Sequence, residues 1–403
     1  MKYSTIEFGV KLPDQPILFE ADSLYARLQE LTDLRDCRGR LYELAPILFI
    51  ALLAKLMGQN QLGAVAHWAK LRVKELSQFL GLKHCRMPHK TTWGRILGEA
   101  VEVAALEQLL GEFFAQTLAA EVPARGSVVL NIDGKTLRGT IPSGSTRGVH
   151  LMAAYLPKQG VVLAQVAVAS KENEIVAAPK LLAQLDLRGM VVTGDAIQAQ
   201  RALSVQIVGQ QGDYAWLVKE NQPGLLTDLE VLFEPEPVAV GCSAHPTDFE
   251  VAKQTDKGHG RLEERTLTLS SWLKDYTPWP HLEQAFKLER KVYTLEGEWL
   301  STEVRYGITS LPRKVAGAKR MLAIVRAAWG IENNLHHQRD VQLAEDHSQL
   351  RRGHAPQLNA ILNNTVLGLL NCKGRTDLAQ ARREFQYDPN LALPFLLANP
   401  FSS

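Results

Sequence analysis

Two short apolar runs, each closed by an aspartate, constrain the fold of this chain more than any other feature. The first run is Gly126–Asp133 (GSVVLNID) and the second is Gly189–Asp195 (GMVVTGD). Short apolar runs that are rich in β-branched residues and bounded by glycine are typical of buried strands. The pattern therefore predicts two neighbouring strands that present Asp133 and Asp195 side by side.

A third acidic residue lies far downstream in a segment with helical spacing. Glu332 belongs to Trp329–Asp340 (WGIENNLHHQRD), whose apolar residues recur at roughly helical intervals. A helix there allows Glu332 to lean over the edge of the sheet. Carboxylate oxygens are hard ligands that suit Mg²⁺ or Mn²⁺. The three acids together predict a two-ion site of the kind that cuts and joins nucleic acid.

Composition sets the broad class of the protein. With 403 residues, 46% of them hydrophobic and 22% charged, we expect a globular protein of two or three domains. The net charge is only +2, so any nucleic-acid surface must be a local basic patch. The cysteines form no CxxC or Cys/His cluster, which argues against a zinc knuckle and a disulfide framework and favours a reducing cytoplasm. They are Cys37, Cys85, Cys242 and Cys372.

No segment of the sequence predicts a membrane anchor or an export signal. The longest apolar stretch, 45–57, carries Lys55 and is shorter than the roughly 20 residues that a bilayer span needs. The first eight residues, 1–8, lack the basic head and apolar core of a signal peptide. We therefore expect a buried helix at 45–57, no membrane partner and a cytoplasmic protein.

The first part of the chain, 1–120, is predicted to be an all-α domain, because apolar residues recur at helical spacing from about 18 to 114. Within it, 83–95 (KHCRMPHKTTWGR) is a basic turn that leads into a new helix, as the second helix of a helix-turn-helix begins. One interpretation is DNA contact through the basic residues of this turn. They are Lys83, Arg86, Lys90 and Arg95. A solvated helix junction is an equally weighted alternative, because short basic turns are common.

Residues 121–372 are predicted to form an α/β catalytic domain. After 122–126 the pattern changes to strand, strand, strand, helix, strand, helix, strand, which is the order of a ribonuclease H-like mixed sheet. A β-rich insertion is expected at about 222–310, and helices are expected to resume from about Lys314 to Leu370. The tail, 373–403, contains three prolines and is expected to be loosely packed.

Several longer motifs carry a family resemblance. In chain order they are Asn131–Gly139 (NIDGKTLRG), Thr193–Ala196 (TGDA), Tyr214–Gln222 (YAWLVKENQ), His259–Glu263 (HGRLE), Trp329–Asn333 (WGIEN), Arg339–Val341 (RDV) and Glu345–Asp346. These motifs resemble the ISAs1 family of insertion-sequence transposases over almost the whole chain, including its helical N-terminal domain.

The resemblance implies a DDE transposase with a ribonuclease H-like core. It makes Asp133, Asp195 and Glu332 the catalytic residues and the ligands of two Mg²⁺ ions, for which Mn²⁺ can substitute. It implies cleavage of the element ends and strand transfer, with water as the first attacking group and a DNA 3′-hydroxyl as the second. The partners implied are double-stranded DNA, namely the terminal inverted repeats and the target, and a second copy of the chain when two ends are held together.

Further residues are predicted to contact DNA. Lys135 and Arg138 follow the first acid and are suited to bind phosphate, with an ordinary exposed turn as the alternative. Lys219 and Asn221 follow a strand of the same sheet and are predicted either to approach DNA or to brace the acids. Ordinary polar residues at the edge of the core are the alternative for that pair.

Three more DNA-binding residues are predicted from the family motifs and from helical spacing. His259 and Arg261 match a motif within the insertion, and the resemblance implies a role on DNA. Arg339 lies two helical turns after Glu332, so both share a face and Arg339 is predicted to hold a phosphate beside the metal ions.

Two minor alternatives concern the same region. Histidines near the third acid allow a zinc site, although zinc requires closer geometry and a clear open position. The residues of that site are His336, His337, His347 and Asp340. Glu345 or Asp346 can replace Glu332 as the third acid, although both lie further along the chain.

Three other functions compete with transposition. A ribonuclease H-like nuclease would hydrolyse phosphodiesters without joining ends, and a domesticated relative would bind DNA without cutting it. The presence of all three acids favours retained chemistry. A glycosidase with paired carboxylates is a distant third, because sugar clefts need aromatic platforms and only 7% of the residues are aromatic.

Overall fold

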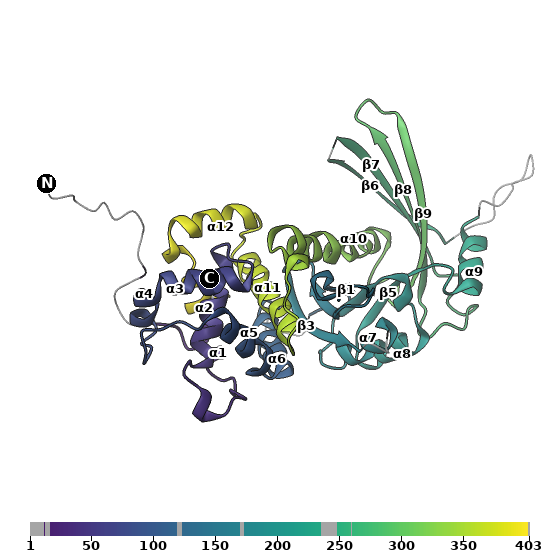
Figure 1. Ribbon diagram of the computed structural model, residues 1–403. Helices are drawn as coiled ribbons and strands as arrows, with labels where there is room; N and C mark the ends of the chain where they lie inside the picture. Colours follow the sequence, from purple (N-terminus) through teal and green to yellow (C-terminus); the bar gives the residue numbers. More distant parts are fainter. Residues whose placement is uncertain are drawn as a thin grey trace, which may run out of the picture.

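The computed structural model describes residues 12, 17–118, 123–169, 173–234, 248–258 and 260–401. His259, one of the predicted DNA-binding residues, lies outside these ranges. A helical unit occupies one end of the molecule, and a long twisted sheet flanked by helices occupies the other (Figure 1). Within the described ranges, no helix has the length and apolarity needed to cross a membrane.

The helical unit is built around one fully buried helix. Its helices are α1 (Leu24–Leu28), α2 (Leu44–Leu56), α3 (Leu62–Leu71), α4 (Val73–Phe79), α5 (Lys90–Glu99) and α6 (Val103–Ala115). The side chains of α2 are buried on all sides, Lys55 included, because its sequence, LAPILFIALLAKL, offers no polar face. Helices before and after it in the chain therefore have to surround it.

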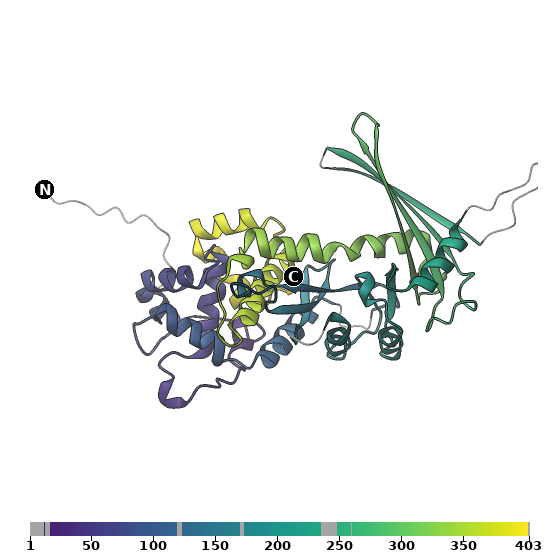
Figure 2. The same ribbon diagram turned by 45° about the vertical axis from the view of Figure 1, so that its right-hand side comes forward.

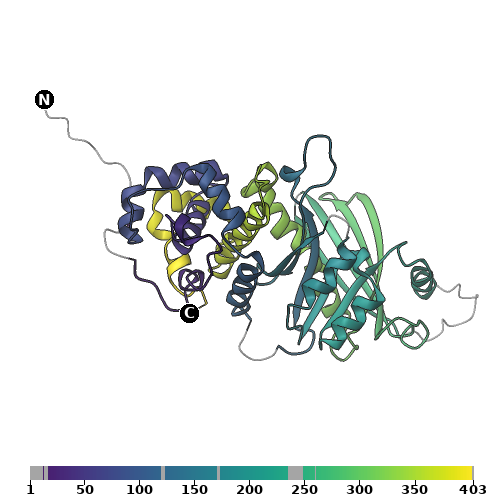
Figure 3. The same cartoon turned by 60° about the horizontal axis from the view of Figure 1, so that its bottom comes forward.

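The C-terminal residues complete this helical unit. Helices α12 (Leu378–Tyr387) and α13 (Pro394–Leu397) lie beside the N-terminal helices (Figure 3). Phe385 is 2% exposed and Leu396 is fully buried. The expectation of a loosely packed end was wrong. Two of the three prolines that prompted it, Pro389 and Pro394, stand in the first turns of short helices, where proline is tolerated.

The sheet contains nine strands in the order β3-β2-β1-β4-β5-β9-β8-β7-β6. They are β1 (Val128–Thr136), β2 (His150–Leu156), β3 (Val161–Val168), β4 (Met190–Gly194), β5 (Asp213–Val218), β6 (Glu250–Gly258), β7 (Arg261–Ser270), β8 (Gln284–Thr294) and β9 (Trp299–Thr309). Strand β2 is antiparallel to β1 and β3, whereas β1, β4 and β5 are parallel. This arrangement of the first five strands confirms the predicted ribonuclease H-like core.

Helices cover both faces of the core strands. Helices α7 (Glu174–Leu182) and α8 (Arg201–Gly209) lie on one face and α10 (Ala318–Ala328) lies on the other (Figure 2). Adjacent residues of β4 point to different helices, because side chains alternate along a strand. Val192 packs in one apolar cluster with Leu203 of α8, and Val191 packs in another with Met321 of α10. Helices therefore pack against both faces of the strands beside the acids.

The segment between β5 and α10 extends the same sheet. It contains α9 (Pro223–Phe233) and strands β6 to β9. Strand β9 pairs with β5, with Thr309 opposite Ala215, so the two long hairpins continue the hydrogen-bonded ladder of the core. Their far ends project away from the body of the molecule (Figure 1).

The chain after α10 departs from the expected run of α-helix up to Leu370. Two π-helical segments follow, η4 (Ile331–His336) and η5 (Gln338–Gln342). A residue in left-handed conformation, Ala344 with φ of 49°, then redirects the chain into α11 (Ala355–Cys372). π-Helical turns are rare and occur frequently at functional sites. The third predicted acid lies in the first of these segments.

Candidate metal centre

Two of the predicted acids lie at the same level on neighbouring parallel strands. Asp195 directly follows β4, but the prediction that Asp133 ends its strand was wrong, because β1 continues to Thr136. Ile132 of β1 is the register partner of Gly194 of β4. The next residues, Asp133 and Asp195, therefore occupy equivalent positions on adjacent strands, and side chains at equivalent positions face the same side of a sheet. Asp195 is exposed and has an extended backbone, with φ of −64° and ψ of 160°, before the short helix η3 (Ala196–Gln198).

The third acid is brought over β1 by a polar anchor. The side-chain amide of Asn131 donates hydrogen bonds to the carbonyls of Ala327 and Ala328, at 2.6 and 3.1 Å, where α10 ends. The hydroxyl of Thr193 in β4 donates to the Asn131 carbonyl oxygen at 2.5 Å and holds this amide in place. The π-helical segment η4 starts directly after this anchor. Glu332, at its second position, thus lies beside β1 at the level of Asp133.

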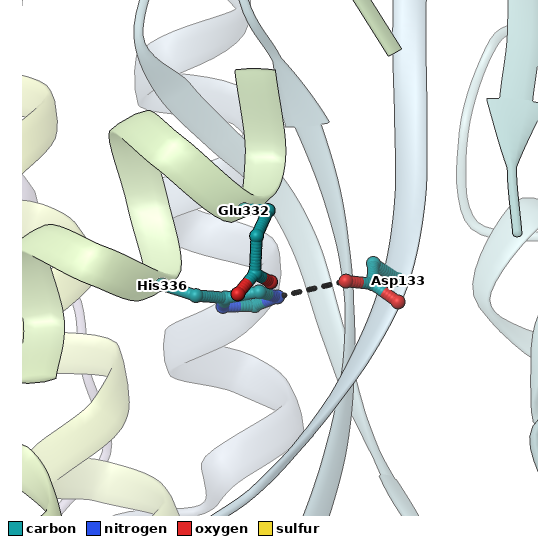
Figure 4. A group of neighbouring side chains, drawn as sticks. All are labelled: Asp133, Glu332 and His336. Atoms are coloured by element: carbon teal, nitrogen blue, oxygen red, sulfur yellow. Dashed lines mark ion pairs between the residues drawn. The ribbon is translucent and has the colours of Figure 1, made fainter. Parts of the chain in front are cut away.

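A carboxylate pair and one imidazole form the centre of the site. Donor atoms of Asp133, Glu332 and His336 all lie within 4.8 Å of one another (Figure 4). Nε2 of His336 is 3.3 Å from Oδ2 of Asp133. Sequence reasoning considered His336 only for a zinc site with other histidines, and the structure places it beside Asp133 instead. Its spacing from Glu332, one helical turn later, was the signal for this contact.

The loop that begins at Asp195 is tied down by three side chains. The amide of Asn221 donates to the carbonyl of Ala196 at 2.8 Å, and that of Gln222 donates to the carbonyl of Ala199 at 3.0 Å. The amide of Gln198 donates to Glu174 at 3.1 Å. Of the two roles predicted for Asn221, these contacts favour bracing the acids.

The basic residues after Asp133 are paired with acids of the segment that follows Glu332. Nζ of Lys135 lies 2.6 Å from Asp340, and the side chain is 10% exposed. Arg138 is far more exposed, at 79%, and its Nε lies 3.6 Å from Asp346. Lys135 is therefore engaged in an ion pair beside the acids, whereas most of the Arg138 side chain is open to solvent.

Comparison with known proteins decides the family. Residues 124–369 match the family model described as Transposase DDE domain, which is more than half of the chain. The chain belongs to the transposase DDE domain family. Residues 25–114 match a second model, described as DDE_Tnp_1-associated, so the helical unit of this DDE transposase also has a family counterpart.

Similar proteins span most of this DDE transposase. "Putative transposase YncI" of Escherichia coli O157:H7 is 29% identical over 362 residues, which are 87% of this chain and 88% of that protein. A protein encoded in the dhlA 3′ region of Xanthobacter autotrophicus is 33% identical over 281 residues, 68% of this chain and 90% of that protein. Among solved structures, a piggyBac transposase synaptic complex with hairpin DNA is 13% identical, with a TM-score of 0.42, and covers 93% of this chain and 77% of that one.

Arg339 of the DDE domain does not play the role predicted for it. Its side chain is 1% exposed and donates three hydrogen bonds of 2.6 to 3.0 Å to Glu345. Glu345 is equally buried and also accepts a hydrogen bond from Asn363 at 2.7 Å. Burial alone would raise the pKa of Glu345, but Arg339 and Asn363 outweigh it and hold the pKa below its usual value. Arg339 is thus closed to phosphate, and Glu345 is closed to a role as third acid.

The remaining predicted DNA contacts are exposed. Lys90 and Arg95 are exposed on α5, whose other face buries Trp93. Arg261 stands at the turn between β6 and β7 and binds Glu263 at 2.7 Å. Lys219 is exposed after β5. The structure leaves these four basic residues accessible to a long ligand.

Proposed function

We propose that this chain is an ISAs1-type insertion-sequence transposase that cleaves the ends of its element and joins them to target DNA. One observation carries the proposal. Strands β1 and β4 pair in register, so that Asp133 and Asp195 occupy equivalent positions, and the carboxylate of Glu332 lies within 4.8 Å of donor atoms of Asp133 and His336. These observations support a centre in which Asp195, from the neighbouring strand, completes the pair of Asp133 and Glu332.

The donor set fits divalent ions. Asp133, Asp195 and Glu332 would hold two Mg²⁺ ions, for which Mn²⁺ can substitute, because hard oxygen ligands suit these ions. When bound, such a pair activates the attacking oxygen and stabilises the leaving oxygen of a phosphodiester. The chain itself orients the acids: Asn221 fixes the loop of Asp195, and Asn131 fixes the end of α10 before Glu332.

The proposed partner is double-stranded DNA, both the terminal inverted repeats and the target. Joining two element ends requires at least a dimer of the chain on DNA. The family and the bacterial relatives support a bacterial cytoplasmic protein that associates with the nucleoid when bound to DNA.

A strand-transfer assay tests the proposal and distinguishes it from the two alternative functions, a nuclease and a DNA-binding relative. Labelled element ends, either uncut or pre-cleaved with a 3′-hydroxyl or a 3′-hydrogen, are incubated with a target plasmid and Mg²⁺. A transposase joins only the 3′-hydroxyl end to the plasmid. Hydrolysis of uncut ends without joining would indicate a nuclease, and binding without any cleavage would indicate a domesticated DNA-binding relative.

Replacing Lys90 and Arg95 together by alanine is expected to weaken binding to element ends. If each residue contacts one phosphate, the slope of log K against log[salt] falls by about 2, because each contact releases roughly 0.9 counterion. Binding isotherms between about 50 and 200 mM salt measure this slope. The matched control is Lys373→Ala together with Arg383→Ala, two exposed residues after α11 and on α12. An unchanged slope in the α5 variant would favour the alternative interpretation, in which 83–95 is a solvated helix junction without DNA contact.

A further inference from the structure

His336 is a buried imidazole with no hydrogen-bond partner among the residues that the structure describes. Its side chain is 4% exposed, and neither Nδ1 nor Nε2 forms a hydrogen bond. Buried polar groups in native proteins are almost always paired, because an unpaired one loses the hydrogen bonds it makes with water. An unpaired buried imidazole therefore calls for a specific explanation.

The ring is aimed at the two carboxylates of the metal centre. Nε2 lies 3.3 Å from Asp133 Oδ2, although the angles are not those of a hydrogen bond. The carboxylate of Glu332 lies over the imidazole ring (Figure 4). All three donor groups fall within 4.8 Å of one another, a separation that one metal ion can bridge.

The local backbone fixes this orientation. Glu332 and His336 belong to the same π-helical segment, η4, and stand one turn apart, the spacing at which helices present two metal ligands on one face. The buried ion pair of Arg339 with Glu345 holds the segment that follows. The imidazole is therefore held in position without a contact made by its own nitrogens.

We propose that His336 is a nitrogen ligand of the metal centre and shares one ion with Asp133 and Glu332. The inference rests on the proposed function, since it assigns a further ligand to the same site. Imidazole favours first-row transition ions, whereas carboxylates alone suit Mg²⁺. The mixed donor set thus gives one ion position a stronger preference for Mn²⁺ than three carboxylates would.

Pulsed electron paramagnetic resonance on the Mn²⁺ complex of the full chain tests this assignment. Protein with natural histidine is expected to show ¹⁴N modulation, which changes to the ¹⁵N pattern when histidine is labelled with ¹⁵N. His336→Gln keeps an oxygen donor and is expected to lose the nitrogen signal. The matched control is His337→Gln, the exposed neighbour, which is expected to retain the signal.

Metal affinity gives a second measurement. Titration calorimetry is expected to show Mn²⁺ binding weakened about 10-fold or more in His336→Gln, with a smaller change for Mg²⁺. Circular dichroism establishes that the variant is folded, and the ¹⁵N experiment on the unmutated chain does not depend on any variant.

The outcomes separate the inference from the proposed function. Mn²⁺ binding without nitrogen coupling, or coupling that persists in His336→Gln, would overturn the assignment of His336 and leave the carboxylate site intact. Failure of the unmutated chain to bind either Mn²⁺ or Mg²⁺ would overturn both. Nitrogen coupling that depends on His336 alone supports the assignment of His336 and the presence of the metal centre.

Discussion

Replacing Asp195 by asparagine is expected to reduce the rate of Mg²⁺-dependent cleavage of element ends by about 10³-fold or more. The physical reason is the loss of a negatively charged ligand at an exposed position beside the cluster of Asp133, Glu332 and His336. Asparagine retains the size of the side chain, so the loop and its contact with Asn221 remain.

Single-turnover kinetics on a labelled element end measure this effect, and filter binding shows that the variant still binds DNA. Asp275→Asn, at an exposed acid between β7 and β8, is the matched control and is expected to cleave at the normal rate. Cleavage by the Asp195 variant at a similar rate to the unmutated chain would mean that the acids have been wrongly assigned.

Replacing Glu345 by alanine is expected to lower the free energy of unfolding by about 3–5 kcal/mol, because it leaves Arg339 buried and unpaired. A second cation is close by. Nζ of Lys55 in α2 lies 2.8 Å from Asn363 Oδ1, and Asn363 also donates to Glu345. Burial lowers the pKa of Lys55 to about 7, and the charge of Glu345 acts in the opposite direction. Without Glu345, both cations lose the group that compensates them.

Urea unfolding followed by circular dichroism measures this loss. The matched control is Glu99→Ala, which breaks an exposed ion pair with Arg352 and is expected to cost less than about 1 kcal/mol. Equal stability of the two variants would contradict the view that Glu345 compensates the buried charge of Arg339.

The core of the fold could be predicted because local sequence determines it. The two apolar runs predicted β1 and β4, although β1 does not end at Asp133, as predicted, but continues to Thr136. The order of strands and helices then leaves few topologies, so the ribonuclease H-like sheet follows.

The burial and pairing of Arg339 could not be predicted, because its environment includes distant parts of the chain. Helical spacing placed it on the same face as Glu332, but η4 and η5 are π-helical and the left-handed Ala344 turns Glu345 back towards it. Its pairing also depends on Asn363 of α11, which no local pattern connects to it.

The contact of His336 with Asp133 could not be predicted from the sequence. His336 lies one turn after Glu332 in the sequence, which allows a shared site, but the sequence does not show which side of the segment faces Asp133. Only the packing of η4 against β1 distinguishes it, because His337 is exposed whereas His336 faces Asp133.

The most direct test of the central claim, that acids from separate segments act as one metal centre, is a double-mutant cycle. Single-turnover cleavage rates are compared for Asp195→Asn, Glu332→Gln and the double variant, with Mg²⁺ and the same element end. Residues that act as a unit are strongly non-additive. We therefore expect the double variant to be no slower than the slower single variant. Rate losses that multiply would show that Asp195 and Glu332 act independently, and they would contradict the shared centre.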